Sequence, residues 1–308
     1  MSAAERLVLT AIVILASIFP VEWLPVGVQM LHGTDGQLSG KQGQVLIVRV
    51  PVDDRTATVE GRFLGRTVHF SPEFDGGQSS GFLALLGIDM QDKPGTHELT
   101  VDVQIQNEHK TLTYNVVVIK ERFAVERLKL PKAKVDLDEK ALARYKDEQA
   151  QVQDALAEDS TLRLWASNFV EPVKGRTSGR FGSVRILNGK PKNPHRGEDI
   201  AAPSGQDVVA SNDGLVRLTV DHIFSGKGIY LDHGLGLYSL YFHLSDILVT
   251  DGEKVKAGQV IGKVGATGRA TGPHLHWGAR VGGAWVNPFS LVSLPLDNHA
   301  APHVGASN

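Results

Sequence analysis

Residues 268–280 read GRATGPHLHWGAR, a glycine-rich stretch that leads into a strand-like run from His274 to Arg280. Side chains alternate between the two faces of a strand, so those of His274 and His276 are expected on one face, about 7 Å apart. From about Asn168 onward the chain keeps this texture of short apolar runs between Gly-containing turns. It predicts further strands at residues 208–210, 214–220, 228–232, 237–243 and 259–264, and hence an antiparallel β domain over about residues 168–290.

The first half of the chain also has the pattern of strands, but its polar residues do not cluster. Short runs rich in β-branched residues predict strands at residues 45–50, 56–60, 65–70, 81–88, 98–106 and 111–119. Residues 100–105 alternate strictly between apolar and polar side chains, as a half-buried strand does. Six or seven such strands predict an immunoglobulin-like β-sandwich over residues 36–120. The fold class of the whole chain is therefore expected to be mainly β.

A charged linker, residues 121–160, separates the two β regions and is expected to hold one amphipathic helix. Asp136 or Asp138 is suited to cap a helix from roughly Glu139 to Glu158. Its apolar side chains recur at helical spacing, at Leu142, Tyr145, Val152 and Leu156. One such helix is not stable alone, so it must pack on a domain or on a partner; an interdomain helix and a partner-binding or regulatory helix both stay open.

Residues 1–31 contain an unbroken run of apolar and small residues, from Leu7 to Phe19, behind Arg6. The thirteen residues of this run fit the apolar region of a signal peptide better than a full membrane span. No clean small-x-small cleavage site follows, so a cleaved signal peptide and a retained signal anchor both stay open. The alternative is a buried N-terminal helix or strand. Residues 291–308 are expected to form a C-terminal tail.

Composition narrows the class of protein. A length of 308 residues favours two domains. The chain has no cysteine, which excludes disulfides and leaves no thiolate for a closed metal site. The net charge of −2 gives no reason to expect a nucleic-acid partner.

A second group of metal-binding residue types is His195-Arg196-Gly197-Glu198-Asp199. His195 and Asp199 have the same parity, so a mostly extended segment would place both side chains on one face. Imidazole and carboxylate groups bind zinc, and three protein ligands with one open position are typical of catalytic zinc. Neither histidine pattern is specific by itself, because a His-x-His pair on a strand is more often a pair of surface residues.

Four segments together carry a resemblance to a known family. Residues 195–205 (HRGEDIAAPSG) are similar to the first zinc motif of the LytM/lysostaphin-type zinc metallopeptidases, peptidase family M23. Residues 241–245 (YFHLS) resemble the central histidine motif of that family, and residues 268–276 (GRATGPHLH) resemble its final motif. Residues 178–182 (SGRFG) resemble the entry to the domain. Order and spacing agree, so the resemblance covers about residues 168–290 and not the N-terminal half.

The resemblance implies a site and an activity. The metal ligands, which would hold Zn²⁺, are His195, Asp199 and His276. His274 would act as general base, and His243 would position the attacking water or stabilise the oxyanion. The implied reaction is hydrolysis of peptide cross-links or stem peptides of bacterial peptidoglycan by zinc-activated water. The protein would work in the cell envelope, periplasmic or extracellular, with a tether to the inner membrane left open.

Two residues and two alternatives need comment. Glu198 stands where the family usually has an apolar residue, and by alternation it should face away from the metal, toward Arg196 or solvent. His233 is expected to be structural or to line the groove. A catalytically silent activator of another cell-wall hydrolase is one alternative, which the intact ligand set disfavours. A biotinyl/lipoyl-like carrier is the other, suggested by residues 251–262, but the hairpin-tip lysine of such carriers is missing.

The N-terminal half is expected to position or restrain the hydrolase domain without sharing its chemistry, because residues 36–160 hold no cluster of His, Asp or Glu. A fragment that begins near Thr161 should therefore bind zinc and hydrolyse soluble peptidoglycan fragments at least as fast as the full chain. The sequence leaves open which peptidoglycan bond is cut and whether there are protein partners.

Overall fold

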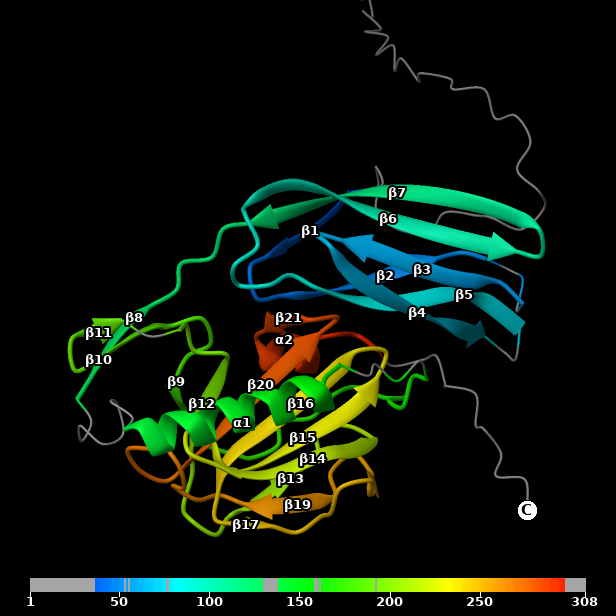
Figure 1. Cartoon of the computed structure of the whole chain (residues 1–308). Helices are drawn as coiled ribbons and strands as arrows, with labels where there is room; N and C mark the ends of the chain where they lie inside the picture. Colours follow the sequence, from blue (N-terminus) through cyan, green and yellow to red (C-terminus); the bar gives the residue numbers. More distant parts are fainter. Residues whose placement is uncertain are drawn as a thin grey trace, which may run out of the picture.

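The computed structural model describes residues 37–52, 54, 56–75, 78–129, 138–157, 160, 162–191 and 193–296, which form the two lobes seen in Figure 1. The predicted signal segment, residues 1–31, lies outside the described residues, as do Thr161 and residues 297–308 of the predicted tail. Within the described part of the chain, no helix is long and apolar enough to cross a membrane.

The N-terminal lobe is one seven-stranded sheet that curls into a barrel-like form. In the order β1-β7-β6-β3-β4-β5-β2, its strands are β1 (Gln37–Lys41), β7 (Glu108–Ile119), β6 (Gly95–Ile105), β3 (Thr58–Phe63), β4 (Arg66–Asp75), β5 (Gln78–Gly87) and β2 (Val45–Val50). A short turn joins the two outer strands, β1 and β2, so that the two edges of the sheet lie close together. The mainly β class is confirmed. The immunoglobulin-like detail is not, because the strands form one continuous sheet rather than two packed sheets.

The interior of this lobe is filled by apolar side chains from β2 to β7. Val101 and Val103, from the strictly alternating run of β6, are both buried in it. β1 was not predicted, because residues 33–43 are rich in glycine. It forms by adding in parallel to the edge of β7, with Gln37 beside Asn115.

The C-terminal lobe is built on a larger antiparallel sheet, as predicted. In the order β18-β14-β15-β16-β20-β12-β9, its strands are β18 (Lys254–Val255), β14 (Gly214–His222), β15 (Gly226–Gly234), β16 (Leu237–Leu244), β20 (His274–Val281), β12 (Gly197–Ala201) and β9 (Arg176–Gly179), with β21 (Ala284–Val286) beside β20. A small sheet of β13 (Asp207–Val209), β19 (Val260–Lys263) and β17 (Asp246–Ile247) shares its core, which includes Ile229, Tyr241 and Trp277. The short helix α2 (Pro288–Val292) follows β21.

The linker helix α1 (Glu139–Ala155) begins at one of the two predicted caps. The Asp138 side chain accepts a hydrogen bond from the Ala141 N–H at 2.8 Å, which satisfies one of the free donors of the first turn. Asp136 and Glu158 lie outside the described residues. The start of the helix therefore follows from its capping chemistry.

The helix packs on the C-terminal lobe, beside β14, where Val152 and Leu156 join a cluster that includes Leu218. Leu142 differs from the prediction, because its side chain is 44% exposed. The buried member of that part of the helix is a charged residue, Glu148.

A small sheet that joins a strand of the linker to two strands of the C-terminal lobe was not predicted. Its strands are β8 (Val125–Leu128), β10 (Val184–Leu187) and β11 (Lys190–Pro191). β8 pairs with β10 in parallel, which sets Glu126 beside Arg185. In Figure 1 this sheet lies at the left edge of the molecule, where the chain crosses from one lobe to the other.

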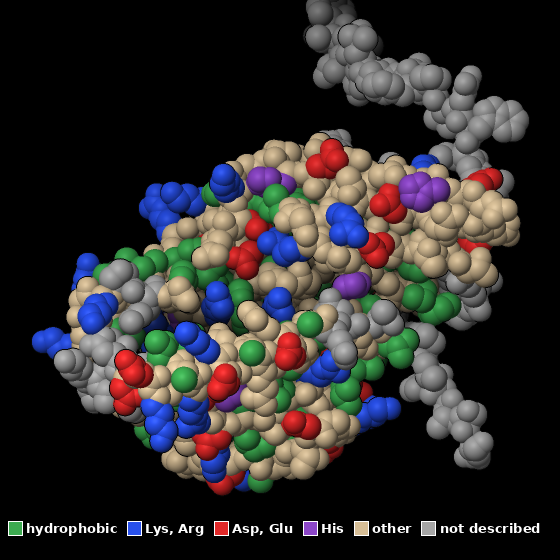
Figure 2. Space-filling model, in the orientation of Figure 1, with side chains coloured by type: hydrophobic (Ala, Val, Ile, Leu, Met, Phe, Trp, Pro, Cys, Tyr) green, Lys and Arg blue, Asp and Glu red, His purple; other side chains and the backbone are tan. Residues whose placement is uncertain are grey.

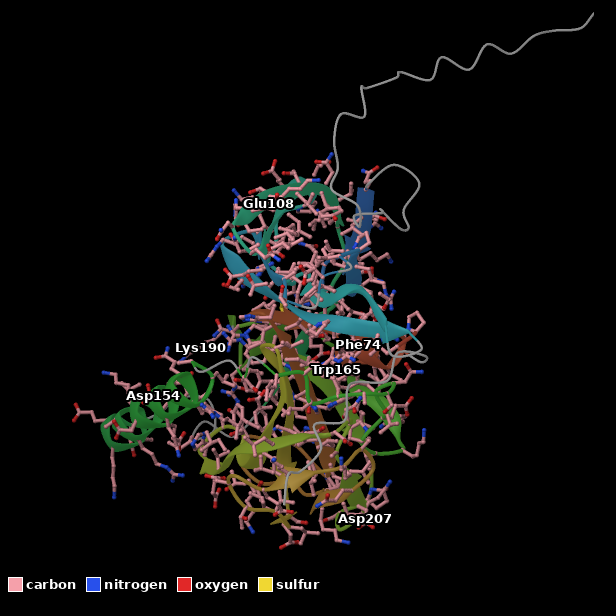
Figure 3. The ribbon with its side chains drawn as sticks, turned by 90° about the vertical axis from the view of Figure 1, so that its right-hand side faces the viewer. Phe74, Glu108, Asp154, Trp165, Lys190 and Asp207 are labelled. Atoms are coloured by element: carbon pink, nitrogen blue, oxygen red, sulfur yellow. The ribbon has the colours of Figure 1, made fainter. Side chains whose placement is uncertain are left out.

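The two lobes share a hydrophobic cluster. The N-terminal lobe contributes Val45, Leu83 and Leu85, and the C-terminal lobe contributes residues that include Trp165, Leu237 and Val281. Figure 3 shows Trp165 at the boundary between the lobes. The outer surface is mixed: acidic and basic side chains are interspersed over the face drawn in Figure 2.

Candidate active site

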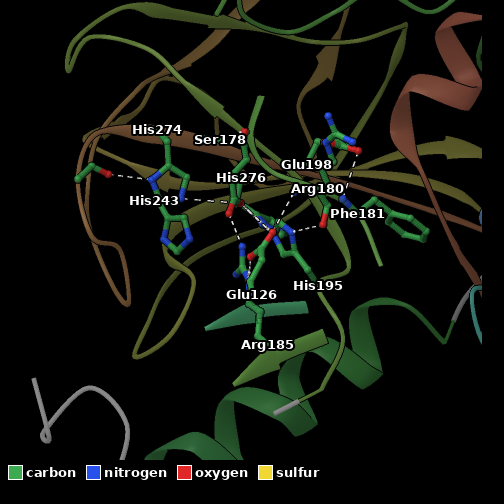
Figure 4. Close-up of polar contacts among 12 residues, drawn as sticks. Glu126, Ser178, Arg180, Phe181, Arg185, His195, Glu198, His243, His274 and His276 are labelled. Carbon is green, nitrogen blue, oxygen red and sulfur yellow. Dashed lines mark hydrogen bonds and ion pairs between the residues drawn. The ribbon is translucent and has the colours of Figure 1, made fainter. Parts of the chain in front are cut away.

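The pairing of β12 with β20 sets Asp199 directly opposite His276. His195 lies just before β12, and its backbone N–H donates to the Ser183 carbonyl oxygen at 2.9 Å. Together these contacts bring one ligand atom from each of the three residues within 4.8 Å of one another (Figure 4). Besides the shared face that the sequence predicted for His195 and Asp199, the site depends on the cross-strand pairing of Asp199 with His276.

Distances within this trio indicate a site for a cation. His195 Nε2 lies 2.9 Å from Asp199 Oδ1 and 2.8 Å from His276 Nδ1. His195 Nδ1 is 3.0 Å from the Arg180 carbonyl oxygen, which only accepts, so we assign the ring proton to Nδ1. In the neutral ring His195 Nε2 then presents a lone pair to a carboxylate oxygen, and two acceptors this close repel each other unless a metal ion or a second ring proton lies between them. The trio therefore fits a metal ion, and its donor types suit zinc.

The charge states of Asp199 and His276 also suit a metal. Burial alone would raise the pKa of Asp199, but the contacts with His195 and His276 hold it well below its usual range. Burial lowers the pKa of His276 to about 4. The carboxylate is therefore ionised and the imidazole neutral near pH 7, which are the forms that bind metal.

Two glycines leave room for these ligands. A Cβ at Gly197 would lie 2.7 Å from His276 Nε2, and a Cβ at Gly179 would lie 2.5 Å from Asp199 Oδ2. Contacts this short would force the ligand side chains to move. The close packing of β9, β12 and β20 around the trio thus depends on glycine at both positions.

His274 and His243 lie beside the trio. His274 Nδ1 is 2.8 Å from the Gly272 carbonyl oxygen, and its Nε2 is 3.8 Å from Asp199 Oδ1. His243 Nδ1 is 2.9 Å from the Thr267 carbonyl oxygen, and its ring centre is 4.8 Å from that of His274. Since a carbonyl oxygen only accepts, both rings carry a proton on Nδ1, and in the neutral form of each ring Nε2 is the acceptor. Burial lowers the pKa of His243 to about 3, so this ring is neutral.

Glu198 differs from its expected environment. It faces away from the trio, but it is buried rather than directed to solvent or Arg196. It accepts hydrogen bonds from the Phe181 N–H at 3.2 Å and from Asn287 Nδ2 at 3.0 Å. Burial raises the pKa of the Glu198 carboxyl. The expected face was correct and the expected surroundings were wrong, because alternation gives the face of a strand and not what covers that face.

His233 is structural, the first of its two predicted roles. Its ring is fully buried, with Nδ1 2.7 Å from the Asp213 carbonyl oxygen and Nε2 2.7 Å from Ser239 Oγ. Burial lowers its pKa to about 4. Both ring nitrogens have partners inside the lobe, so the residue is not part of the candidate site.

One residue of the site was missed in the sequence. Arg185, on β10, donates from Nη2 to Asp199 Oδ2, which leaves Oδ1 facing the two histidines. No local pattern in residues 184–187 marks this arginine. Its contact depends on the pairing of β10 with the linker strand β8, which the sequence did not indicate.

Comparisons with known proteins agree with this geometry. Residues 193–288 match the model of peptidase family M23. The chain is 45% identical over 103 residues to the peptidoglycan DD-endopeptidase ShyA of Vibrio cholerae, an alignment that covers 33% of this chain and 24% of the relative. It is 46% identical over 101 residues to the DD-carboxypeptidase/endopeptidase Mpg of Neisseria meningitidis, covering 33% of this chain and 23% of the relative. The match thus spans about a quarter of the length of these curated relatives.

A solved structure extends the likeness to both lobes. The crystal structure of a protein from Pseudomonas aeruginosa, described as a peptidase of family M23, superposes with a TM-score of 0.62 at 30% identity. The superposition covers 82% of this chain and 94% of that one. The family match and the His-Asp-His trio together place this chain in the class of the metallopeptidases. This chain belongs to peptidase family M23.

Proposed function

We propose that this chain is a zinc-dependent endopeptidase that hydrolyses peptide cross-links or stem peptides of bacterial peptidoglycan. The convergence of His195 Nε2, Asp199 Oδ1 and His276 Nδ1 on one point is the observation that carries the proposal. The relatives are named as a peptidoglycan DD-endopeptidase (ShyA) and a DD-carboxypeptidase/endopeptidase (Mpg), which favours a peptide bond between D-configured residues as the substrate.

The side chains of the site have separate roles in this proposal. A bound Zn²⁺ would lower the pKa of water to about 7 and polarise the scissile carbonyl. In its neutral form His274 takes the proton of the attacking water on Nε2 and returns it to the leaving amine. His243 also offers an unprotonated Nε2, so it accepts a hydrogen bond from that water. Of its two predicted roles, this tautomer supports positioning the water over donating to the oxyanion.

The test combines metal analysis with digestion of purified sacculi. We expect one zinc per chain and release of muropeptides cut at peptide bonds, identified by mass. The matched control is Asp199→Asn, which keeps the shape of the ligand but removes its charge, and should lose both zinc and activity. A wild-type chain that takes up no zinc on reconstitution would overturn the proposal. A chain that binds zinc but releases no fragment would favour the silent activator.

The proposal includes work in the cell envelope, because peptidoglycan lies outside the cytoplasmic membrane and the run from Leu7 to Phe19 suits an export signal or anchor. Cell fractionation should find the chain with the envelope or the periplasm. Recovery of the full-length chain in the cytosol alone would contradict it.

A further inference from the structure

A chain of polar contacts leads from the linker between the lobes to the metal trio. Glu126, on β8, accepts a hydrogen bond from Arg185 Nε at 3.2 Å. Arg185 in turn donates from Nη2 to Asp199 Oδ2. Figure 4 shows Glu126 next to Arg185. The parallel pairing of β8 with β10 fixes the first contact, because Glu126 and Arg185 are register partners.

Glu126 also reaches the other side of the trio through the backbone. Its Oε1 accepts a hydrogen bond from the Arg180 N–H at 3.4 Å. The Arg180 carbonyl oxygen accepts a hydrogen bond from His195 Nδ1 at 3.0 Å, and this contact sets the tautomer of the His195 ring. The Glu126 carboxylate thus contacts two arginines, Arg185 and Arg180, which in turn contact Asp199 and His195 of the trio.

The two charges of the pair have opposite effects on a bound cation. Arg185 fixes the rotation of the Asp199 carboxylate by holding Oδ2, and so presents Oδ1 to the trio. Its own positive charge, however, opposes a metal ion nearby. Glu126 offsets that charge, and the side chains of both are only about a quarter exposed, at 23% for Glu126 and 24% for Arg185, so solvent screens them incompletely.

We propose that Glu126 and Arg185 are a positioning pair for the Asp199 carboxylate, so that the linker strand β8 is part of the support of the metal site. The inference rests on the proposed function, because it takes Asp199 as a metal ligand. It also changes the division of labour expected from the sequence. Residues 120–124 alone join β7 of the N-terminal lobe to β8, so the support of Asp199 begins a few residues from that lobe.

The test measures zinc affinity of the full chain by competition with a chromogenic chelator. Glu126→Gln removes the charge but keeps an acceptor for Arg185 and Arg180. Partners that orient metal ligands typically contribute about 10- to 100-fold in affinity, and we expect a loss of about 10-fold. The matched control is Glu121→Gln, in the same linker. The Glu121 carboxylate forms an ion pair with Lys41 of the N-terminal lobe, with a distance of 3.1 Å between Oε2 and Nζ. The zinc affinity of this control should equal that of the wild type.

The same substitution in an Arg185→Gln chain distinguishes two roles of Glu126: offsetting the charge of Arg185, and a merely structural role. In an Arg185→Gln chain, Glu126→Gln should reduce zinc affinity much less, because the charge to be offset is gone. The visible spectrum of the Co²⁺-loaded chain should change in the Glu126→Gln variant and not in the control. Thermal unfolding of each metal-free variant monitors the fold.

The outcomes distinguish the inference from the proposed function. If the wild type binds zinc and Glu126→Gln binds it equally tightly, the inference is wrong while the metal site stands. An equal loss in both backgrounds would show that Glu126 acts without Arg185 and would overturn the pair. If the wild type binds no zinc, the proposed function itself fails.

Discussion

His274 and His276 lie two positions apart on β20, yet their ring nitrogens meet different partners. His276 Nδ1 faces Asp199 and His195, whereas His274 donates from Nδ1 to a carbonyl oxygen, and its Nε2 lies 3.8 Å from Asp199 Oδ1, too far for a hydrogen bond. Ligation and proton transfer are therefore assigned to different rings. We expect His274→Ala to keep its zinc but lose about 10²- to 10⁴-fold in turnover.

The matched control for this prediction is His276→Ala, which should lose the metal. Zinc content by elemental analysis and turnover on soluble muropeptides are measured on both variants. If His274→Ala lost its zinc and kept a rate in proportion to the metal that remained, the two roles would be reversed.

Single residues differ in how far the sequence reveals them. The shared face of His274 and His276 follows from the period of a strand, which is a local property. Arg185 could not be found this way, because its contact with Asp199 requires β10 to pair with a strand that precedes it by about sixty residues. The buried environment of Glu198 was missed for the same reason, since Phe181 and Asn287 approach it from other segments.

The helix α1 secures the turn that supports His243. Glu148 accepts hydrogen bonds from the Ile223 N–H at 3.0 and 3.1 Å and from Arg144 Nε at 2.8 Å. The same turn continues to Ser225, whose carbonyl oxygen accepts from the His243 N–H at 2.9 Å. A change in the helix can therefore reach the active site through the backbone.

Glu148→Ala tests this role of α1. Loss of the carboxylate leaves the Ile223 N–H without its acceptor, and we expect the free energy of unfolding to fall by about 1–3 kcal/mol. Turnover should fall at unchanged zinc content, and amide hydrogen exchange should rise at residues 221–225. Asp147→Ala, at the neighbouring exposed position, is the control and should change stability by less than about 0.5 kcal/mol. Equal effects of the two substitutions would contradict the role of Glu148.

The start of α1 was predictable and its docked face was only partly so. Asp138 caps the helix by a contact within the first turn, which a sequence pattern captures. Val152 and Leu156 pack on the C-terminal lobe at helical spacing as expected. Leu142 is exposed and Glu148 is buried. The surface under the helix includes the Ile223 backbone N–H, which needs an acceptor, and the Glu148 carboxylate supplies it.

Across the whole molecule, β5 connects the two lobes because both of its faces are buried. Phe82, Ala84 and Leu86 point into the N-terminal barrel. Leu83 and Leu85 belong to the cluster shared with the C-terminal lobe. A strand covered on both sides appears as a continuous apolar run rather than an alternating one, which is the pattern of residues 82–86, FLALL. The apolar run of residues 82–86 thus indicates a strand that is buried on both faces, and the structure shows that the second face is covered by the other lobe.

The backbones of the two lobes also approach closely at this contact. A Cβ at Gly87, at the end of β5, would lie 2.9 Å from the Val281 carbonyl oxygen of β20. A fragment that begins near Thr161 would leave Leu237 and Val281 without their cover and would lack β8 and α1. These contacts lead us to expect lower stability and weaker zinc binding from such a fragment, in place of the full activity that the sequence suggested.

We predict that the two lobes unfold together in one transition, because the shared cluster couples them. Leu83→Ala removes a side chain that is 2% exposed and should cost about 2–5 kcal/mol of unfolding free energy. Because Leu83 lies between the lobes, hydrogen exchange should rise in β20 of the C-terminal lobe as well as in β5. Leu64→Ala, the same substitution at a side chain that is 41% exposed in the N-terminal lobe, should leave both strands unchanged. Two separate transitions in calorimetry, of which Leu83→Ala shifts only one, would show that the lobes are independent despite their contact.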